Sequence, residues 1–524
     1  MHRRTYTFIG FAIFLIALLS VLSVPSSTVA DATMRGQFSN ANLRDDTLFK
    51  YAEYLLEEGE YEDAAREFDR LVVDFPNSSL RPRAQYMAAD AYFDAAMYNE
   101  SQRGFAFFLA NFPRSPYAEK ANVLMSAAIE LERTAKPALV PTYSPSESIF
   151  AAEKPLKAVQ VMFFGGRSYA EIESEFATLE QNGIDTVIMR VFHNRGDRLY
   201  PLVKANIAPG ERGGEVGVYF NTDKSPVVED ILGDVVKIAH RHDIKLFAWM
   251  TTRYANYGIE DRRDLQCKGY NFDTGKIERC KGLDLFNEEA VRRLENIYAD
   301  LASYEIDGIL FQDDLVLRHN EGYGEAAERG FRQEMGRPLS PELFYNRKPG
   351  SSRVDYTARF WEWASWKNRK LLGVADRLMR TVKRKNPDVR FAINLMYEAV
   401  TSPVNGLAWL SQDLERAKGV GFDYYSIMAY HRQMGDELHK NPEEIRQMIV
   451  SLVKEAVRVI GEPHKVLIKF QTVDWNTSRR LPNSEVVSLV HSVRSTDTVS
   501  LAVIPYRRGF PFYELGGATE MAKR

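Results

Sequence analysis

The chain of 524 residues is 45% hydrophobic, 27% charged and 12% aromatic, a globular composition that excludes a largely disordered, collagenous or polytopic membrane protein. Its 68 basic and 71 acidic residues give a net charge of −3, so it lacks the basic surplus that is typical of nucleic-acid-binding proteins. Its two cysteines, Cys267 and Cys280, are too few for a disulfide-built scaffold or a cysteine-rich metal site.

The first 30 residues have the pattern of a secretory signal peptide. Arg3 and Arg4 precede an apolar stretch from Phe8 to Val24, which is followed by the small residues Thr28-Val29-Ala30. We expect cleavage after Ala30 and a periplasmic or secreted mature chain, without a lipid anchor because no cysteine lies near that point. An uncleaved membrane anchor is the alternative, since the apolar stretch is near the lower length limit of a transmembrane helix.

Residues 51–78 and 88–115 contain two copies of a helical repeat. Small and aromatic residues recur at helical spacing in both copies, and Phe75-Pro76 and Phe112-Pro113 lie 37 positions apart. The copies resemble tetratricopeptide repeats, and a third helix over 118–133 is expected to cap the stack. We therefore predict an all-α repeat domain over residues 41–134, which either docks a protein partner or positions the neighbouring domain.

Residues 135–156 carry proline and serine without apolar periodicity, which is typical of a linker. Beyond the linker, apolar strand-like runs alternate with helical patterns. The expected strands are Ala158–Phe164, Thr186–Phe192, Lys245–Met250, Gly308–Phe311, Arg390–Leu395, Tyr424–Met428, Val466–Phe470 and Val499–Ile504. The helices expected between them include Glu171–Gln181, Val227–His240, Glu288–Tyr304, Ala364–Lys385 and Glu443–Ile460.

Strands that are joined by helical crossovers pair in parallel, and eight such strands close a (β/α)8 barrel. We therefore predict an α/β fold, a (β/α)8 TIM barrel over residues 157–515. An open doubly wound sheet is the alternative, but Phe164-Gly165-Gly166-Arg167 lacks the GxGxxG turn that binds a dinucleotide, and we expect no cofactor. Barrel enzymes carry their chemistry on the loops after the strands, which are longest here over 193–225, 251–285 and 313–354.

Two adjacent carboxylates, Asp313 and Asp314, directly follow the fourth strand. Glycosidic cleavage needs one carboxyl group to protonate the departing oxygen, and a second carboxylate or the substrate's own acetamido group to support the oxocarbenium-like centre. Adjacent side chains on a strand point to opposite faces, so we expect one aspartate to face the substrate and the other to orient it. We assign Asp313 as the central acid and Asp314 as its partner, with Glu398 and Asp474 as candidates for the second acid. The alternative is that both aspartates are solvated loop acids.

Aromatic, amide and histidine side chains follow most of the other strands. Flat apolar rings beside hydrogen-bonding groups suit sugars, whose C–H faces are apolar and whose hydroxyls are polar. The candidate substrate-binding residues are His193, Trp249, Asn394, Tyr430, His431, Gln471 and Trp475. A single ring at such a position is explained by packing, but rings at five of the eight strand ends favour binding.

Other chemistries find less support in the sequence. His240-Arg241-His242-Asp243 lies at a helix end where the two histidines diverge, so we expect no metal site. The absence of HExxH and GxSxG argues against a zincin and an α/β-hydrolase. In an oxidising compartment Cys267 and Cys280 are expected to pair and staple a short loop, with two unpaired thiols as the alternative.

The segment Asp307–Asp314, DGILFQDD, resembles the DGILFHDD signature of the C-terminal hydrolase domain of PgaB-type proteins, which process poly-β-1,6-N-acetyl-D-glucosamine. Further motifs of that family resemble, in order, Phe247–Met250, Asn394 with Trp409, Ile427–Ala429, and Gln471 with Trp475. The resemblance extends over most of residues 157–510. It implies a (β/α)8 glycoside hydrolase that acts on partly de-N-acetylated polymer, with Asp313 and Asp314 central. The repeats occupy the place of the family's deacetylase domain, so we expect no deacetylation.

The sequence departs from that family at several expected carboxylates. Gln312 replaces a histidine, Lys469 replaces a glutamate, Gln160–Phe164 lacks the acidic residues of the first strand, and Tyr506-Arg507 stands where a Pro-Asp pair is expected. Several carboxylates that would attract the ammonium groups of glucosamine are therefore absent. A neutral or acidic glycan therefore becomes an alternative to a cationic polymer.

The sequence thus predicts an exported glycoside hydrolase that cleaves an amino-sugar exopolysaccharide, such as partly deacetylated poly-β-1,6-N-acetyl-D-glucosamine, during polymer export or biofilm turnover. One alternative is a catalytically degenerate barrel that binds the glycan while the repeats dock a partner in a polysaccharide export complex. Another is a structural envelope adaptor that binds no glycan. We expect no nucleic-acid partner, and membrane contact only through the signal segment if it stays uncleaved.

Overall fold

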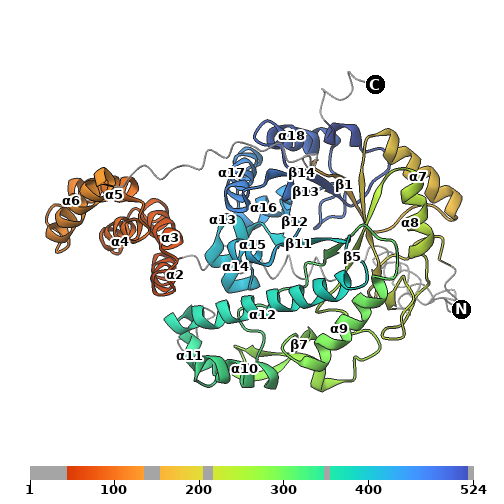
Figure 1. Ribbon diagram of the computed structural model, residues 1–524, viewed down its shortest axis with the longest axis horizontal. Coiled ribbons are helices and arrows are strands. Elements are labelled where there is room, and N and C mark those ends of the chain that lie inside the picture. Colours follow the sequence, from red (N-terminus) through yellow and green to blue (C-terminus); the bar gives the residue numbers. More distant parts are fainter. Residues whose placement is uncertain (1–43, 135–153, 204–215, 347–353, 517–524) are drawn as a thin grey trace, which may run out of the picture.

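The computed structural model describes residues 44–134, 154–203, 216–346 and 354–516 (Figure 1). The predicted signal peptide, residues 1–30, and residues 135–153 of the predicted linker lie outside the described residues. No helix within the described ranges is long and apolar enough to cross a membrane.

The described chain begins with an arm of helices that pack in chain order (Figure 1). They are α2 (Asp45–Glu57), α3 (Tyr61–Asp74), α4 (Arg81–Asp94), α5 (Tyr98–Asn111) and α6 (Ala118–Thr134). Ala64, Ala65 and Phe68 of α3 are fully buried, because small residues allow the helices to approach closely and one ring fills the remaining space. In the next layer the ring of Tyr86 lies 5.8 Å from that of Phe105. The predicted all-α region is confirmed.

Eight parallel strands form a closed barrel, in the order β1, β2, β5, β8, β11, β12, β13, β14 and back to β1. Their bounds are β1 (Lys157–Val161), β2 (Thr186–Arg190), β5 (Lys245–Met250), β8 (Gly308–Phe311), β11 (Arg390–Met396), β12 (Tyr424–Met428), β13 (Val466–Gln471) and β14 (Ser500–Ile504). The ring closes at β1, where Val159 lies opposite Val187 of β2 and Val503 of β14. The strands are apolar along most of their length because helices cover their outer faces. The predicted TIM barrel is confirmed.

The helices between the strands form the outer layer of the barrel (Figure 1). They include α7 (Tyr169–Gln181), α8 (Leu232–Arg241), α9 (Glu288–Leu301), α12 (Ala358–Lys383), α15 (Leu414–Val420), α17 (Pro442–Ile460) and α18 (Asn483–Arg494). Helix α8 begins at Leu232 and not at the predicted Val227, because Val227 forms a β-bridge with Val218 after Pro226. Helix α12 begins at Ala358, ahead of the predicted Ala364.

The long loops on the carboxyl side of the barrel contain small antiparallel hairpins. One pairs β3 (Phe192–His193) with β4 (Gly217–Val218), and another pairs β6 (Gln266–Asn271) with β7 (Lys276–Leu283). A disulfide between Cys267 and Cys280 links β6 to β7, so the predicted pairing is confirmed.

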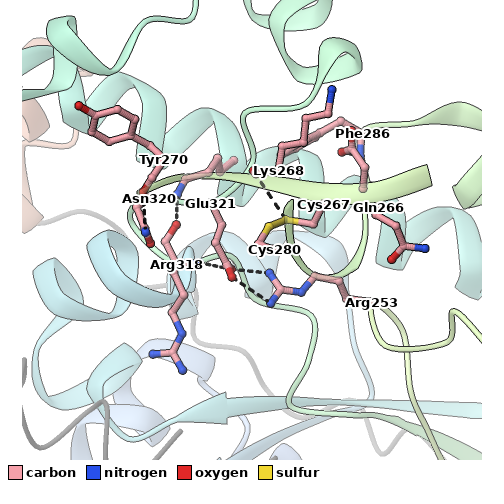
Figure 2. The surroundings of a disulfide bond; sticks show 12 residues. Arg253, Gln266, Cys267, Lys268, Tyr270, Cys280, Phe286, Arg318, Asn320 and Glu321 are labelled. Atoms are coloured by element: carbon pink, nitrogen blue, oxygen red, sulfur yellow. Dashed lines mark hydrogen bonds and ion pairs between the residues drawn. A yellow bond between two sulfur atoms is a disulfide. The ribbon is translucent and has the colours of Figure 1, made fainter. Parts of the chain in front are cut away.

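The disulfide lies in a group of contacts between two loops on the carboxyl side of the barrel (Figure 2). Beside it, Nη1 of Arg253, after β5, lies 2.6 Å from Oε2 of Glu321, in the loop after β8. The Asn320 side chain donates a hydrogen bond to the Tyr270 carbonyl of β6 at 2.9 Å. The hairpin therefore connects the loop after β5 to the loop that carries Asp313.

The helical arm packs on the barrel through α2. The Tyr51 ring lies 4.9 Å from the ring of Trp361 in α12, and Trp361 is fully buried. The Tyr54 hydroxyl donates to Oγ of Ser365 at 2.5 Å, and Arg416 of α15 donates to the same oxygen at 2.7 Å. The arm and the barrel thus share one apolar core. The sequence, with a linker predicted between the two parts, did not predict this contact.

Candidate active site at the carboxyl ends of the barrel strands

A pocket opens at the carboxyl ends of the strands, with an empty volume of about 920 Å³, and we call it the barrel pocket. This end of a TIM barrel is where active sites lie. Its lining residues are Gln160, Met162, Arg190, Phe192, Asn194, Asp197, Trp249, Gln312, Asp313, Asn394, Met396, Tyr397, Met428, Tyr430, Gln433, Lys469, Trp475 and Ile504.

The floor of the barrel pocket is a buried polar cluster around Lys469. The Nζ atom of Lys469 donates to Oδ1 of Asn394 at 2.5 Å and to Oε1 of Gln160 at 3.1 Å. These residues belong to β13, β11 and β1, and all three are more than nine-tenths buried. Burial lowers the pKa of Lys469 to about 7, while the Asp313 carboxylate opposes that shift. A buried lysine and a carboxylate therefore interact in the pocket.

The two adjacent aspartates occupy different surroundings, as their alternation on the chain predicts. Asp313 lines the pocket, whereas Asp314 is buried and does not. Asp314 accepts hydrogen bonds from the hydroxyls of Thr251 and Thr252, each at 2.6 Å. It also accepts bonds from the backbone N–H groups of Thr252 and Tyr254, at 3.0 and 2.8 Å. These contacts tie the loop after β8 to the loop after β5.

One wall of the pocket contains a buried ion pair. Nη1 of Arg190, the last residue of β2, lies 3.0 Å from Oδ2 of Asp197, and both side chains are at most 5% exposed. The same Asp197 oxygen accepts a bond from the Asn194 N–H at 2.9 Å. The Tyr257 hydroxyl donates to Oδ1 of Asn194 at 2.8 Å. Asp197 is thus held by its neighbours within the wall.

Aromatic rings form other walls of the pocket. Trp249 packs edge to face on Phe192, with ring centroids 5.5 Å apart. Trp475 packs in a similar way on Tyr430 at 5.6 Å. The indole N–H groups of Trp249 and Trp475 have no hydrogen-bond partner among the described residues. Rings with a polar edge are suited to a sugar.

A second depression, with an empty volume of about 410 Å³, adjoins the pocket at Gln433 and Trp475. Its lining residues are Arg432, Gln433, Asp436, Glu437, Asp474, Trp475 and Asn476. Glu437 is buried and accepts hydrogen bonds from the Tyr397 hydroxyl and the Gln433 amide, both at 2.8 Å. Asp474 lines this second depression and not the barrel pocket. Its Oδ1 accepts hydrogen bonds from the backbone N–H groups of Asn476 and Thr477.

Several predicted site residues lie behind the walls of the pocket. The Tyr219 hydroxyl is 2.7 Å from Nδ1 of His193, and burial, aided by Arg190, lowers the pKa of His193 to about 4. Nε2 of His431 lies 2.7 Å from Oε1 of Glu485, and burial lowers the pKa of His431.

The remaining two predicted residues are also outside the pocket lining. Gln471 accepts hydrogen bonds from the N–H groups of Arg432 and Gln433, at the start of α16 (His431–Leu438), so it orients that helix. Glu398 is buried in the first turn of α13 (Glu398–Thr401). Of the predicted residues, the pocket thus brings together Trp249, Asp313, Asn394, Tyr430 and Trp475.

Sequence reasoning missed several residues that line the pocket. Gln160 and Lys469 had been noted only as positions where carboxylates are lost, and Arg190 and Asp197 had no role. The available signal was a basic residue within an otherwise apolar strand, at Arg190 in β2 and Lys469 in β13. A buried charge needs a partner, and each of these residues has one across the pocket wall or floor.

The described residues contain no group of three or more His, Cys, Asp or Glu side chains that could hold a metal ion. His240 and His242 form separate contacts, with Asp307 at 2.9 Å and Glu180 at 2.7 Å. The lining of the barrel pocket combines carboxylates, a lysine, an arginine, amides and aromatic rings.

Comparisons with known proteins agree with this architecture. The family model described as hypothetical glycosyl hydrolase family 13 (GHL13) matches residues 173–503, and that of YfiO, an outer membrane lipoprotein, matches residues 42–161. The glycoside hydrolase domain of PgaB (BpsB) from Bordetella bronchiseptica is 19% identical with a TM-score of 0.53, covering 71% of this chain and 98% of that domain. This likeness shows the barrel fold.

A second solved structure, the catalytic domain of β-amylase from Paenibacillus polymyxa, is 12% identical with a TM-score of 0.44, covering 71% of this chain and 100% of that domain. α-L-Fucosidase isoenzyme 2 from Paenibacillus thiaminolyticus is 11% identical with a TM-score of 0.43, covering 71% of this chain and 49% of that one. No curated protein matches this sequence.

Proposed function

Because the chain belongs to hypothetical glycosyl hydrolase family 13, we propose that it is an exported glycoside hydrolase that uses Asp313 for proton transfer. The observation that carries this proposal is the position of Asp313 in an aromatic-walled pocket at the carboxyl ends of the barrel strands. Glycosidic cleavage requires a carboxyl group that protonates the departing oxygen. Asp197 is the other carboxylate in the lining, and its bonds to Arg190 and Asn194 hold it in the wall.

The proposed substrate is an amino-sugar exopolysaccharide, such as partly deacetylated poly-β-1,6-N-acetyl-D-glucosamine. The motif at Asp307–Asp314 and the rings of Trp249, Tyr430 and Trp475 support it, since rings stack on the apolar faces of sugars. The substrate's acetamido group would then support the oxocarbenium-like centre, because Asp197 is engaged elsewhere.

We further propose that the protein acts in the cell envelope during polymer export or biofilm turnover. The match of residues 42–161 to an outer membrane lipoprotein supports that location. The helical arm would dock a protein partner of the export complex while α2 fixes it to the barrel.

A panel of purified polysaccharides incubated with the protein, followed by mass spectrometry of released oligosaccharides, tests the proposed activity. The panel comprises fully acetylated and partly deacetylated poly-β-1,6-N-acetyl-D-glucosamine, chitin oligomers and a uronate polymer. We expect release from a polymer that contains N-acetylglucosamine, and loss of release in Asp313→Asn. Asp388→Asn, an exposed position at the opposite end of the barrel, is the matched control and should behave as the unmodified protein.

The second candidate function is a glycan-binding scaffold without activity. The observation that favours it is Lys469, which occupies the pocket floor where the resembling family has a glutamate. A scaffold predicts that the unmodified protein and Asp313→Asn bind polymer equally and that neither releases oligosaccharides.

A further inference from the structure

The floor of the barrel pocket contains buried hydrogen-bond donors that have no partner among the described residues. Gln160 is fully buried, and its Oε1 accepts the bond from Lys469. Because an ammonium group only donates, this bond fixes which end of the Gln160 amide faces the lysine. Its Nε2 atom therefore carries the N–H groups, and that atom has no partner among the described residues.

Two neighbouring side chains have the same property. Nε1 of Trp249 and Nε of Arg190 lack hydrogen-bond partners within the described part of the chain, and these side chains are 8% and 2% exposed. Both residues line the barrel pocket together with Gln160. A buried donor without a partner destabilises the protein by about 1–3 kcal/mol, so a ligand that accepts these bonds recovers that free energy. The floor thus favours a ligand group that carries acceptor oxygens.

The charges of the floor are already matched. Lys469 interacts with Asp313, and Arg190 pairs with Asp197. A ligand ammonium group placed over the floor would add a third positive charge, and it would offer only donors to Gln160 and Trp249, whose donors lack partners among the described residues. A like charge in a buried site is unfavourable. The de-N-acetylated form of an amino sugar is therefore a poor occupant of this position.

We propose that the barrel pocket is specific for an N-acetylated sugar, whose acetamido carbonyl accepts hydrogen bonds from Trp249 and from Gln160, the amide that Lys469 orients at the floor. This inference rests on the proposed function, because it takes the ligand to be an amino-sugar polymer. A uronate carboxylate offers similar acceptors. The acetamido group has in addition an N–H, which suits Oε1 of Gln312, an acceptor in the lining without a partner among the described residues.

Calorimetric titration with thio-linked tetrasaccharides, which resist hydrolysis, tests this inference. Three β-1,6-linked probes are compared: one fully N-acetylated, one fully de-N-acetylated, and one N-acetylated chain whose non-reducing end is a glucuronate in place of N-acetylglucosamine. We expect the N-acetylated probe to bind at least about tenfold more tightly than the de-N-acetylated one, a ratio that corresponds to about 1.4 kcal/mol. Equal or tighter binding of the de-N-acetylated probe, or binding of no probe, overturns the inference. Tighter binding of the glucuronate probe overturns the acetamido assignment.

Variants of the floor test the named contacts. Gln160→Met and Lys469→Met should each weaken binding of the N-acetylated probe by about tenfold or more. Gln160→Glu keeps an acceptor for Lys469 but removes the free donor and adds a negative charge. It should therefore reduce the ratio of the affinity for the N-acetylated probe to the affinity for the de-N-acetylated probe. Lys465→Gln, on the surface beside the start of β13, is the matched control and should bind as the unmodified protein. Unchanged affinity in both Gln160 variants, with melting temperatures that show folded protein, contradicts the assignment.

The binding experiment is independent of the test of activity. The thio-linked probes report binding alone. Loss of the predicted preference therefore overturns the inference about the floor, whereas the hydrolase proposal is decided by cleavage of ordinary oxygen-linked polymer. Conversely, absence of cleavage overturns the hydrolase proposal while the order of affinities still tests the floor.

Discussion

At the residue scale, two neighbouring aspartates have separate tasks. Asp314 accepts hydrogen bonds from Thr251, Thr252 and Tyr254 and joins two loops, whereas Asp313 faces the pocket. Strand alternation predicted this separation from sequence. It did not tell which aspartate would face inward, because that depends on how the chain leaves β8.

Asp314→Asn is expected to lower the free energy of unfolding by about 3 kcal/mol. The amide retains one acceptor oxygen but turns an NH2 group toward donors, so at least one buried N–H or hydroxyl loses its partner. Urea unfolding measures the effect, with Asp388→Asn, at an exposed position, as the control that should change stability little. A stability of Asp314→Asn equal to that of the unmodified protein would show that these contacts do not hold the loops.

Lys469 predicts a pH-dependent contribution to stability. Its pKa is lowered to about 7 in the folded protein from 10.5, so between these values the unfolded chain binds the proton that the folded chain has released. The cost of burying the charge is complete below about pH 7 and disappears as the pH rises toward 10.5. The unfolding free energy of the unmodified protein, relative to Lys469→Met, should therefore rise by up to about 1.4 kcal/mol per pH unit in this window.

Urea unfolding of both proteins at pH 7 and at about pH 10 measures this difference. Comparison with Lys469→Met cancels the titration of other groups, including Lys367, whose pKa burial also lowers to about 7. A difference that does not vary with pH would mean that Lys469 keeps its proton throughout, as a surface lysine does.

The floor cluster could not be predicted from the sequence. Gln160 and Lys469 are separated by 309 positions, and Asn394 is 75 positions from Lys469. The closed barrel brings their strands to one end of its interior. Separate polar residues in apolar strands give no sign of their partners. From the sequence, Lys469 was therefore noted only as a replacement for the glutamate of the resembling family.

At the element scale, the eight strands were predictable because buried parallel strands are short apolar runs between helical patterns. The errors occur where local pairing overrides periodicity. Val227 belongs by pattern to a helix, yet its bridge to Val218 delays α8 to Leu232. The β3–β4 hairpin was also missed, since strands of two residues leave no pattern.

The β6–β7 hairpin carries a prediction of its own. The disulfide closes a loop with a sequence separation of 13, so the double variant Cys267→Ala/Cys280→Ala should be about 3 kcal/mol less stable. A reducing agent should lower the melting temperature of the unmodified protein and leave that of the variant unchanged. An equal fall of the melting temperature in both proteins would show that the reducing agent does not act through this disulfide.

The same variant tests how the hairpin supports the site. Figure 2 shows the disulfide beside the Arg253–Glu321 ion pair, which joins the loops after β5 and β8. We expect faster proteolysis within the loop after β8 in the double variant than in the unmodified protein. Identical cleavage patterns would show that the ion pair alone orders the loop.

At the scale of the whole molecule, the arm and the barrel are joined by α2. The repeat pattern and the linker composition predicted two domains, but not the shared core of Tyr51 and Trp361. Surface residues of a repeat and of a barrel helix look alike in sequence whether they face solvent or each other. The aromatic content is therefore used in three places: within the arm, at the junction and in the pocket.

Tyr51→Ala is expected to loosen this junction. Removal of a buried ring should cost about 3 kcal/mol, because it leaves a cavity against Trp361. The measurement is limited proteolysis, which should release the arm from the barrel sooner in the variant. Tyr61→Ala, at an exposed position of α3, is the control. Equal release rates in the two variants would mean that other contacts hold the arm.

The central claim is that Asp313 performs glycosidic cleavage in the barrel pocket. The most direct measurement is the initial rate of oligosaccharide release from partly deacetylated poly-β-1,6-N-acetyl-D-glucosamine, together with the affinity for the same polymer. The account predicts release by the unmodified protein. In Asp313→Asn the rate of release should fall by at least about 100-fold while the affinity for the polymer is retained. Release by Asp313→Asn at the unmodified rate, or polymer binding by the unmodified protein without any release, would contradict it.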